Sequence, residues 1–161
     1  DEAWNRRFGP YATTPPEGPA MTRIVEAMRA RGTHLEPTLW VLGRSPADSI
    51  SARWSRAIVG RAAAAGIPIL AGTDGLIDAD STALPNLHKE LALLVEAGLT
   101  PAKALAAATT VPARLMGRGT THGAVAAGRV ADLVLLEGNP LVDIASTTRI
   151  RMVVRRGEIL P

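Results

Sequence analysis

Residues 67–75 read Ile67-Pro68-Ile69-Leu70-Ala71-Gly72-Thr73-Asp74-Gly75, and this stretch decides the fold class. Its first five residues form a short apolar run, which predicts a buried strand over 67–71. Gly72 and Gly75 predict a sharp turn where the backbone passes close to another group. Because ligands of parallel sheets bind at the carboxyl ends of strands, Asp74 lies where a carboxylate can hold a metal or accept a proton. A second role stays open for Asp74, as a cap that orders the turn or the next helix.

The segments on both sides of this stretch alternate between helical and strand-like patterns. A second apolar stretch, 35–42, predicts another buried strand. Helical spacing, ended by glycine or started by a Thr-Pro pair, covers 21–31, 49–65, 87–97, 100–108 and 110–117. Strands separated by helices of this length indicate βαβ units with parallel strands. We therefore predict an α/β part over 21–118 in which the strands 35–42 and 67–74 are parallel neighbours.

The two ends of the chain differ from this central part. Residues 1–20 are dense in proline and glycine, which predicts an irregular loop or linker that Trp4 and Phe8 attach to an apolar surface. Residues 119–161 combine β-rich stretches with turn signals. They predict a small antiparallel sheet appended to the α/β part.

Composition narrows the class of protein. The 161 residues suit one ordinary domain, and 47% are hydrophobic, so a sizeable core is expected. The net charge is +3, but the arginines are scattered and aromatic residues make up only 3%, which does not favour a nucleic-acid partner. The absence of cysteine excludes a disulfide scaffold and a thiolate metal site. No apolar run approaches the roughly 20 residues of a membrane span, so no membrane partner is expected, and the localisation stays open.

Several motifs, in order along the chain, resemble the C-terminal part of the metal-dependent amidohydrolase superfamily, in its imidazolonepropionase-like and Xaa-Pro-dipeptidase-like branch. They are Pro37-Thr38-Leu39, the Gly72-Thr73-Asp74 strand end, the helix pair around Gly98-Leu99-Thr100-Pro101, and the stretch 131–141. The resemblance covers about residues 21–161. It implies the last two βα units of a (β/α)8 TIM-like barrel, followed by C-terminal strands of a small β-sandwich.

The resemblance also implies a chemistry. It suggests hydrolysis of a C–N bond in an amide, cyclic amide or dipeptide-like small molecule, with one or two divalent metals, usually zinc, at the barrel mouth. Asp74 matches the strand-8 aspartate that in this family ligates the metal and takes the proton of the bridging water. A deaminase or deacetylase of the same superfamily shares this aspartate and stays an alternative. A non-catalytic split subunit or remnant is a further alternative.

The other ligands of the family are not found in this sequence. There is no His-x-His pair, and both lysines, Lys89 and Lys103, follow the last predicted barrel strand. Two strands do not close a barrel, and one carboxylate cannot hold a zinc ion that takes three or four ligands. We therefore interpret the chain as a C-terminal fragment whose partner is the missing N-terminal barrel portion. We expect the chain alone to be inactive and to self-associate through its uncovered strand edge.

A few further residues are candidates for substrate contacts. His88 opens the helix after residues 76–85, so it either touches substrate or is simply a polar residue in a first helical turn. The segment 76–85 follows a strand end and is a candidate substrate-facing loop. His34 and His122 are interpreted as structural or solvated side chains.

Overall fold

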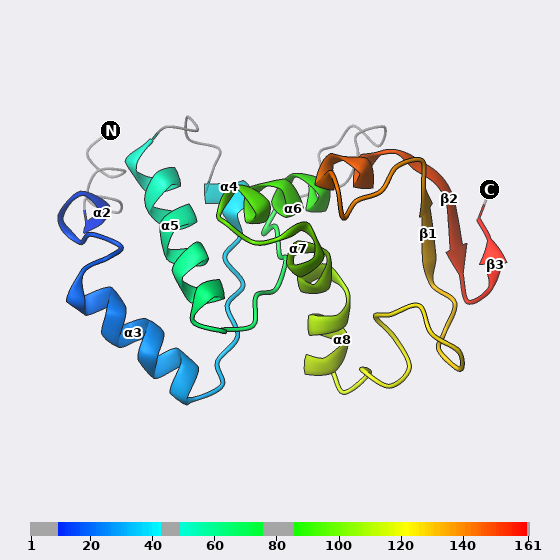
Figure 1. The fold of residues 1–161 in the computed structure, drawn as a ribbon, viewed down its shortest axis with the longest axis horizontal. Helices are drawn as coiled ribbons and strands as arrows, with labels where there is room; N and C mark the ends of the chain where they lie inside the picture. The colour runs from blue at the N-terminus through cyan, green and yellow to red at the C-terminus, as the bar shows by residue number, and fades with distance from the viewer. Residues whose placement is uncertain (1–9, 43–48, 76–85, 161) are drawn as a thin grey trace.

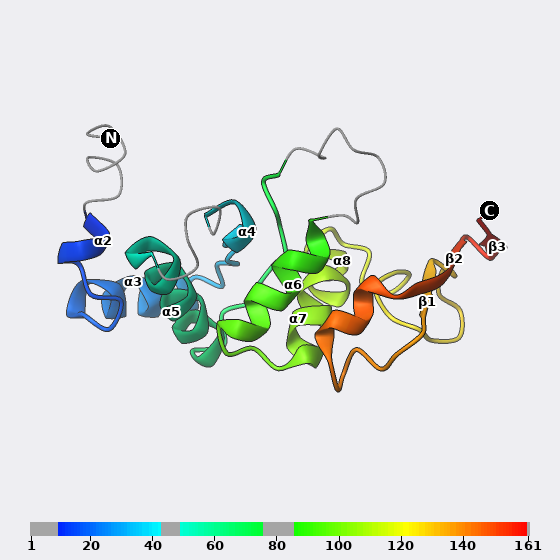
Figure 2. The ribbon, with the colours of Figure 1, turned by 90° about the horizontal axis from the view of Figure 1, so that it is seen from above.

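The computed structural model describes residues 10–42, 49–75 and 86–160 (Figure 1). Its helices are α2 (Pro10–Thr13), α3 (Pro19–Ala30), α4 (Leu39–Leu42), α5 (Ile50–Ala64), α6 (Leu87–Glu96), α7 (Pro101–Ala108), α8 (Thr110–Leu115) and the 3-10 helix η1 (Ile144–Thr148). Its strands are β1 (Leu133–Leu136), β2 (Ile150–Arg155) and β3 (Glu158–Ile159). Figures 1 and 2 show an elongated arrangement, with α2 and α3 at one end and the sheet at the other.

The long helices begin and end where the sequence predicts. The Ser49 hydroxyl accepts a hydrogen bond from the Ala52 N–H at 3.2 Å and so caps α5. Thr100 caps α7 in the same way, and Pro101 fills its first position. Gly98 lies just past α6 with φ of +101°, a conformation that side chains with a Cβ rarely adopt. The predicted helical segments are thereby confirmed.

Two extended segments run side by side through the centre of the α/β part. Leu35 and Ile69 form a parallel bridge. The Leu35 N–H donates to the Pro68 carbonyl at 3.0 Å, and the Leu70 N–H donates to the Leu35 carbonyl at 2.9 Å. The prediction that these segments are parallel neighbours is confirmed, but the predicted strands over 35–42 and 67–74 are each reduced to one bridge residue within an extended segment.

The prediction of a strand over 35–42 is wrong for its second half. Residues 39–42 form the short helix α4, and the extended conformation ends before them. An uninterrupted apolar run does not distinguish a buried strand from a buried helix turn. Leu39, at the start of α4, is 3% exposed, so the apolar pattern predicts its burial correctly but not its helical conformation.

The N-terminal segment is more ordered than a linker. The expectation of irregular structure over 1–20 is wrong for α2 and for the start of α3 at Pro19. The Trp54 indole of α5 donates to the Thr14 carbonyl at 2.6 Å, and its ring meets Tyr11 edge-on at 4.9 Å. These contacts fix the segment against α5, whereas Trp4 and Phe8 lie outside the described residues.

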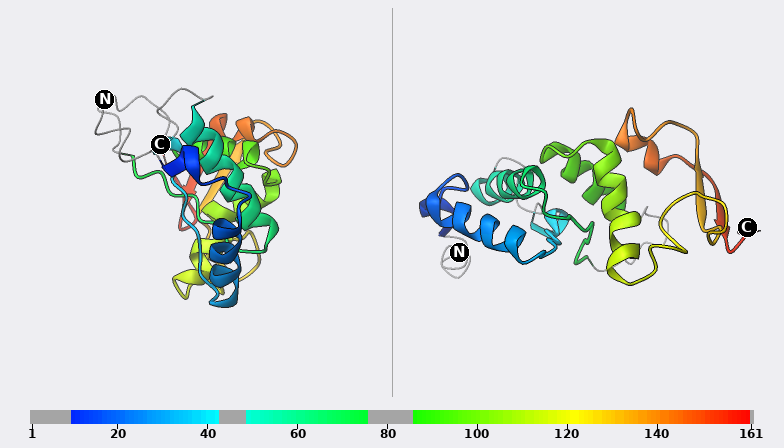
Figure 3. Two further views of the ribbon diagram at one scale, coloured as in Figure 1. Left: turned by 90° about the vertical axis from the view of Figure 1, so that its left-hand side faces the viewer. Right: turned by 60° about the horizontal axis from the view of Figure 1, so that its bottom comes forward.

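The core lies between the extended segments and the helices that flank them (Figure 3). Val59 of α5, Leu94 of α6 and Ala104 of α7 are at most 1% exposed. Ile144 of η1 joins the same cluster. The C-terminal part is therefore attached to the α/β part through η1 and α6.

The C-terminal strands form the predicted antiparallel sheet, in the order β1-β2-β3. A tight turn joins β2 and β3, with Arg156 and Gly157 both at positive φ. The Asp132 carboxylate accepts a hydrogen bond from the Arg156 N–H at 2.8 Å and so holds this turn against the start of β1. The motif at 131–141 thus has a structural role in the sheet.

A close approach of α5 and α6 gives a first testable prediction. A β-carbon at Gly60 would collide with the Ala97 carbonyl oxygen just past α6. We expect Gly60→Ala to destabilise the protein by about 1–3 kcal/mol, because the helices must move apart. At an exposed helical position the same change would instead stabilise by up to about 1 kcal/mol. Thermal unfolding shows whether Gly60→Ala lowers or raises the stability, and a raised melting temperature would contradict the close contact between Gly60 and Ala97.

Candidate functional site

Both extended segments end in a residue with a left-handed backbone. Thr38 has φ of +49° and Asp74 has φ of +46°. This conformation is uncommon for residues other than glycine, and for a β-branched residue such as Thr38 it is strained. Strained residues of this kind cluster at functional sites. Because the segments are parallel neighbours, both residues lie at the same edge, where the carboxyl ends of strands meet.

Asp74 is exposed at this edge. Thr73 contributes to the turn around it: the Thr73 hydroxyl accepts a hydrogen bond from the Gly75 N–H at 3.4 Å. The next helix, α6, has Asn86 and not Asp74 at its N-cap position. The carboxylate of Asp74 is therefore presented to solvent at the end of the segment.

The two glycines beside Asp74 are points of close approach, as the sequence predicts. A β-carbon at Gly75 would collide with the Trp40 ring and lie 3.2 Å from the Asn86 side-chain nitrogen. A β-carbon at Gly72 would collide with the Glu36 carboxylate. The groups that come close belong to the neighbouring segment and to the residue before α6.

Glu90 of α6 is fully buried beneath this edge. Its carboxylate accepts hydrogen bonds from the N–H groups of Leu39 at 3.1 Å and Trp40 at 2.7 Å. Burial raises the pKa of the Glu90 carboxyl, the two hydrogen bonds oppose this rise, and the negative charge of Glu36 adds to it. The Glu90 carboxylate thus ties α6 to the turn that follows Thr38.

The sequence interpretation missed Glu90, although a signal was present. Leu87, Leu91 and Leu94 form the apolar face of α6, and Glu90 lies on that same face. A charged side chain within an apolar face is rarely left buried without partners. The pattern therefore indicates a buried hydrogen-bonded carboxylate, but it does not identify the partners, which lie about 50 positions away in the sequence.

His88 lies in the first turn of α6 and is half-buried. Its Nδ1 atom is buried and has no hydrogen-bond partner among the residues that the structure describes. Burial lowers the pKa of His88 and so favours the neutral ring. A contact of His88 with substrate stays a prediction, and the candidate loop 76–85 lies outside the described residues.

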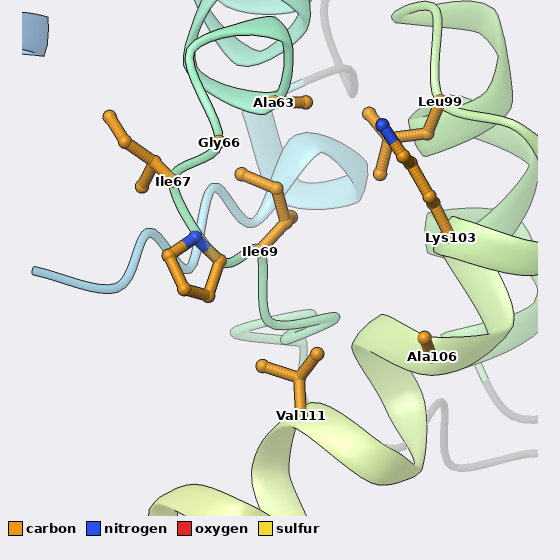
Figure 4. Close-up of a pocket in the computed structure, with 9 residues that line it drawn as sticks. Ala63, Gly66, Ile67, Ile69, Leu99, Lys103, Ala106 and Val111 are labelled. Atoms are coloured by element: carbon orange, nitrogen blue, oxygen red, sulfur yellow. The ribbon is translucent and has the colours of Figure 1, made fainter. Parts of the chain in front are cut away.

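Two cavities flank the extended segments. One, of about 190 Å³, is lined by Gly66, Ile67 and Pro68 at the start of the second segment, and on its other side Lys103 extends along α7 towards Leu99 (Figure 4). The other, of about 260 Å³, borders Glu36, Gly72 and apolar residues of α6, α7 and α8. Of these two cavities, the second adjoins the edge that carries Asp74, and its lining includes the charged residue Glu36.

Comparison with known proteins identifies the family. The sequence profile of the amidohydrolase family matches residues 6–160. This chain belongs to the amidohydrolase family. The resemblance that the motifs predict is thereby confirmed.

Individual relatives of this amidohydrolase chain agree with the predicted branch. Over 72 residues, 45% of this chain and 17% of the relative, it is 43% identical to an imidazolonepropionase of Chromobacterium violaceum. A crystal structure of a Xaa-Pro dipeptidase with bound methionine matches with 26% identity and a TM-score of 0.67, over 84% of this chain and 36% of that one. The A. niger ochratoxinase matches with 26% identity and a TM-score of 0.70, over 85% of this chain and 34% of that one. The amidohydrolase chain described here therefore spans about a third of the length of these solved structures.

The described residues of this amidohydrolase chain do not by themselves fit a complete metal site. Within 10–42, 49–75 and 86–160, no group of three or more His, Asp or Glu side chains is placed to hold one ion. Zinc sites take three or four protein ligands. Asp74 is therefore at most one ligand of such a site. The structure also contains no helix, among the residues described, that is long and apolar enough to cross a bilayer.

Proposed function

We propose that this chain is the C-terminal part of a metal-dependent hydrolase that cleaves a C–N bond in an amide, cyclic amide or dipeptide-like small molecule. Family membership supports hydrolysis as the reaction class. The observation that carries the proposal is Asp74 itself, an exposed carboxylate with φ of +46° at the end of an extended segment that has a parallel neighbour. This is the edge where enzymes with parallel strands hold their substrates.

In this proposal Asp74 has two roles. Its carboxylate would be one ligand of a divalent metal, zinc in the first instance, and such a metal would supply an activated water near neutral pH. The same carboxylate accepts a proton from the attacking water and returns it to the leaving nitrogen. Exposure at the edge suits both roles, because the side chain can reach a substrate without moving the backbone.

The remaining ligands and the rest of the barrel come, in this proposal, from polypeptide outside these 161 residues. The single parallel bridge between Leu35 and Ile69, followed on each side by helices, is consistent with the last two βα units of a barrel. The lack of a three-ligand group in the described residues and the one-third coverage of the solved relatives support the same view. The N-terminal barrel portion is then the partner that completes the site.

The reaction class is tested with the full-length protein loaded with zinc. We expect release of free amine from N-acyl amino acids, Xaa-Pro dipeptides or cyclic amides, loss of this activity with a chelator, and recovery when zinc is added back. Ammonia release from amino-heterocycles, with no turnover of amides, would instead indicate the deaminase alternative. A protein that turns over neither class would favour a non-catalytic remnant.

A second measurement tests the metal ligands directly. We expect the isolated 161-residue chain to bind zinc no more tightly than roughly 10 μM, because a single carboxylate at the edge supplies too few ligands. Isothermal titration calorimetry of the chain, with Asp74→Asn as the matched variant, measures this affinity. Tight binding at one zinc per chain would contradict the proposal that most ligands lie elsewhere.

A further inference from the structure

We propose that Glu90 is a positioning residue for Asp74, acting through the turn at residues 38–40 and the ring of Trp40. The inference rests on the proposed function of Asp74, but the effect of Glu90 on the position of residues 72–75 can be tested without measuring activity. The connection consists of contacts between three parts of the fold: α6, the turn before α4, and the turn at Gly75.

The first contact joins α6 to the turn before α4. Glu90 is 0% exposed, and each of its carboxylate oxygens accepts one backbone N–H, from Leu39 and Trp40. These N–H groups come directly after Thr38, whose left-handed backbone is unfavourable for a β-branched residue. A strained residue persists only where its surroundings hold it. The two hydrogen bonds from Glu90 supply that hold.

The second contact joins this turn to Asp74. A β-carbon at Gly75 would collide with the Trp40 ring, so any side chain at that position would displace the ring. The Trp40 N–H donates to the Glu90 carboxylate at 2.7 Å, and this hydrogen bond holds the backbone from which the ring extends. Gly75 follows Asp74 immediately, and the two share one turn. Glu90 therefore restricts where the Asp74 carboxylate can lie.

A merely structural role for Glu90 makes a different prediction. If the carboxylate only stabilises the start of α4, its loss lowers stability and leaves the geometry at Asp74 unchanged. If it positions Asp74, its loss changes that geometry as well. Because a displacement of about 1 Å at a reacting group can cost about 100-fold in rate, the second case is visible in kcat.

The test uses the full-length protein with Glu90→Gln, Trp40→Leu, the double variant, and Glu96→Gln as the control on the exposed face of the same helix. Glutamine keeps the shape of Glu90 but accepts from only one of the two N–H groups. We expect Glu90→Gln and Trp40→Leu each to lower kcat by about 10- to 100-fold with KM changed less than about threefold. The kcat of the double variant should be no lower than that of the less active single variant, because both substitutions interrupt the same series of contacts.

Hydrogen exchange gives a readout that does not depend on the reaction. The Gly75 amide, which donates to the Thr73 hydroxyl at 3.4 Å, should exchange faster in Glu90→Gln and in Trp40→Leu than in the unmodified protein, and Glu96→Gln should leave it unchanged. Unchanged exchange of the Gly75 amide in both variants, or effects of the two substitutions on kcat that multiply, would overturn the positioning role. If exchange rises but Asp74 proves unimportant for activity, the proposed function fails and the positioning of residues 72–75 by Glu90 stands.

Discussion

Asp74→Asn in the full-length protein is expected to lower kcat/KM by about 1,000-fold, within the range of 10²- to 10⁴-fold typical of a lost proton-transfer group. Asparagine has nearly the same shape but cannot accept the proton of the attacking water. It also tolerates the left-handed backbone that Asp74 adopts, so the turn is expected to stay intact. Steady-state kinetics with an amide substrate and a thermal melt measure the two effects separately.

The matched control for this prediction is Asp132→Asn. Asp132 accepts a hydrogen bond from the Arg156 N–H through one oxygen, which an asparagine side chain retains, and it lies just before β1. We expect this variant to keep its activity within about twofold of the unmodified protein, as for a surface change distant from the site. If Asp74→Asn keeps more than a tenth of the activity, Asp74 does not move the proton, and the central assumption of the proposed function is wrong.

The fold could be predicted from the sequence where an element depends only on residues close to it in the chain. Ser49 and the Thr100-Pro101 pair mark helix starts by chemistry that involves only their own neighbours, and the structure confirms them. The parallel pairing at Leu35 and Ile69 followed from helices placed between two apolar runs. Residues 39–42 could not be assigned in this way, because their burial depends on α5 and α6 rather than on their own pattern.

In the candidate site, too, local sequence signals identify some residues and long-range contacts determine the others. Asp74 could be identified from the sequence, because the apolar run, the two glycines and the carboxylate are contiguous. Glu90 could not be connected with it, since its hydrogen bonds reach residues 50 and 51 positions away. The sequence places Trp40 in a predicted strand, and its approach to the turn of Asp74 is visible only in the structure, where its ring lies against Gly75. Long-range polar contacts of this kind are set by tertiary packing, which a helix pattern does not encode.

Leu94→Ala is expected to destabilise the protein by about 3 kcal/mol, within the range of 2–5 kcal/mol for buried leucines. Leu94 is 0% exposed, and its helix α6 contacts α4, α5, α7 and η1, so the surrounding elements cannot easily collapse into the space left behind. Leu115→Ala in α8 is the control, because that side chain is 53% exposed and its truncation should cost well under 1 kcal/mol. Thermal unfolding measures both, and equal melting temperatures for the two variants would contradict the packing described for α6.

The same variant separates packing from positioning on one helix. Leu94 lies one turn after Glu90 on the buried face of α6, but it makes no hydrogen bond to the turn at residues 38–40. We therefore expect Leu94→Ala to lower the melting temperature while kcat, measured well below that temperature, stays within about threefold of the unmodified protein. Glu90→Gln should show a large loss of kcat relative to its loss of stability. If Leu94→Ala lowers kcat as much as Glu90→Gln does, α6 acts on the Asp74 turn through its packing as a whole rather than through the Glu90 carboxylate.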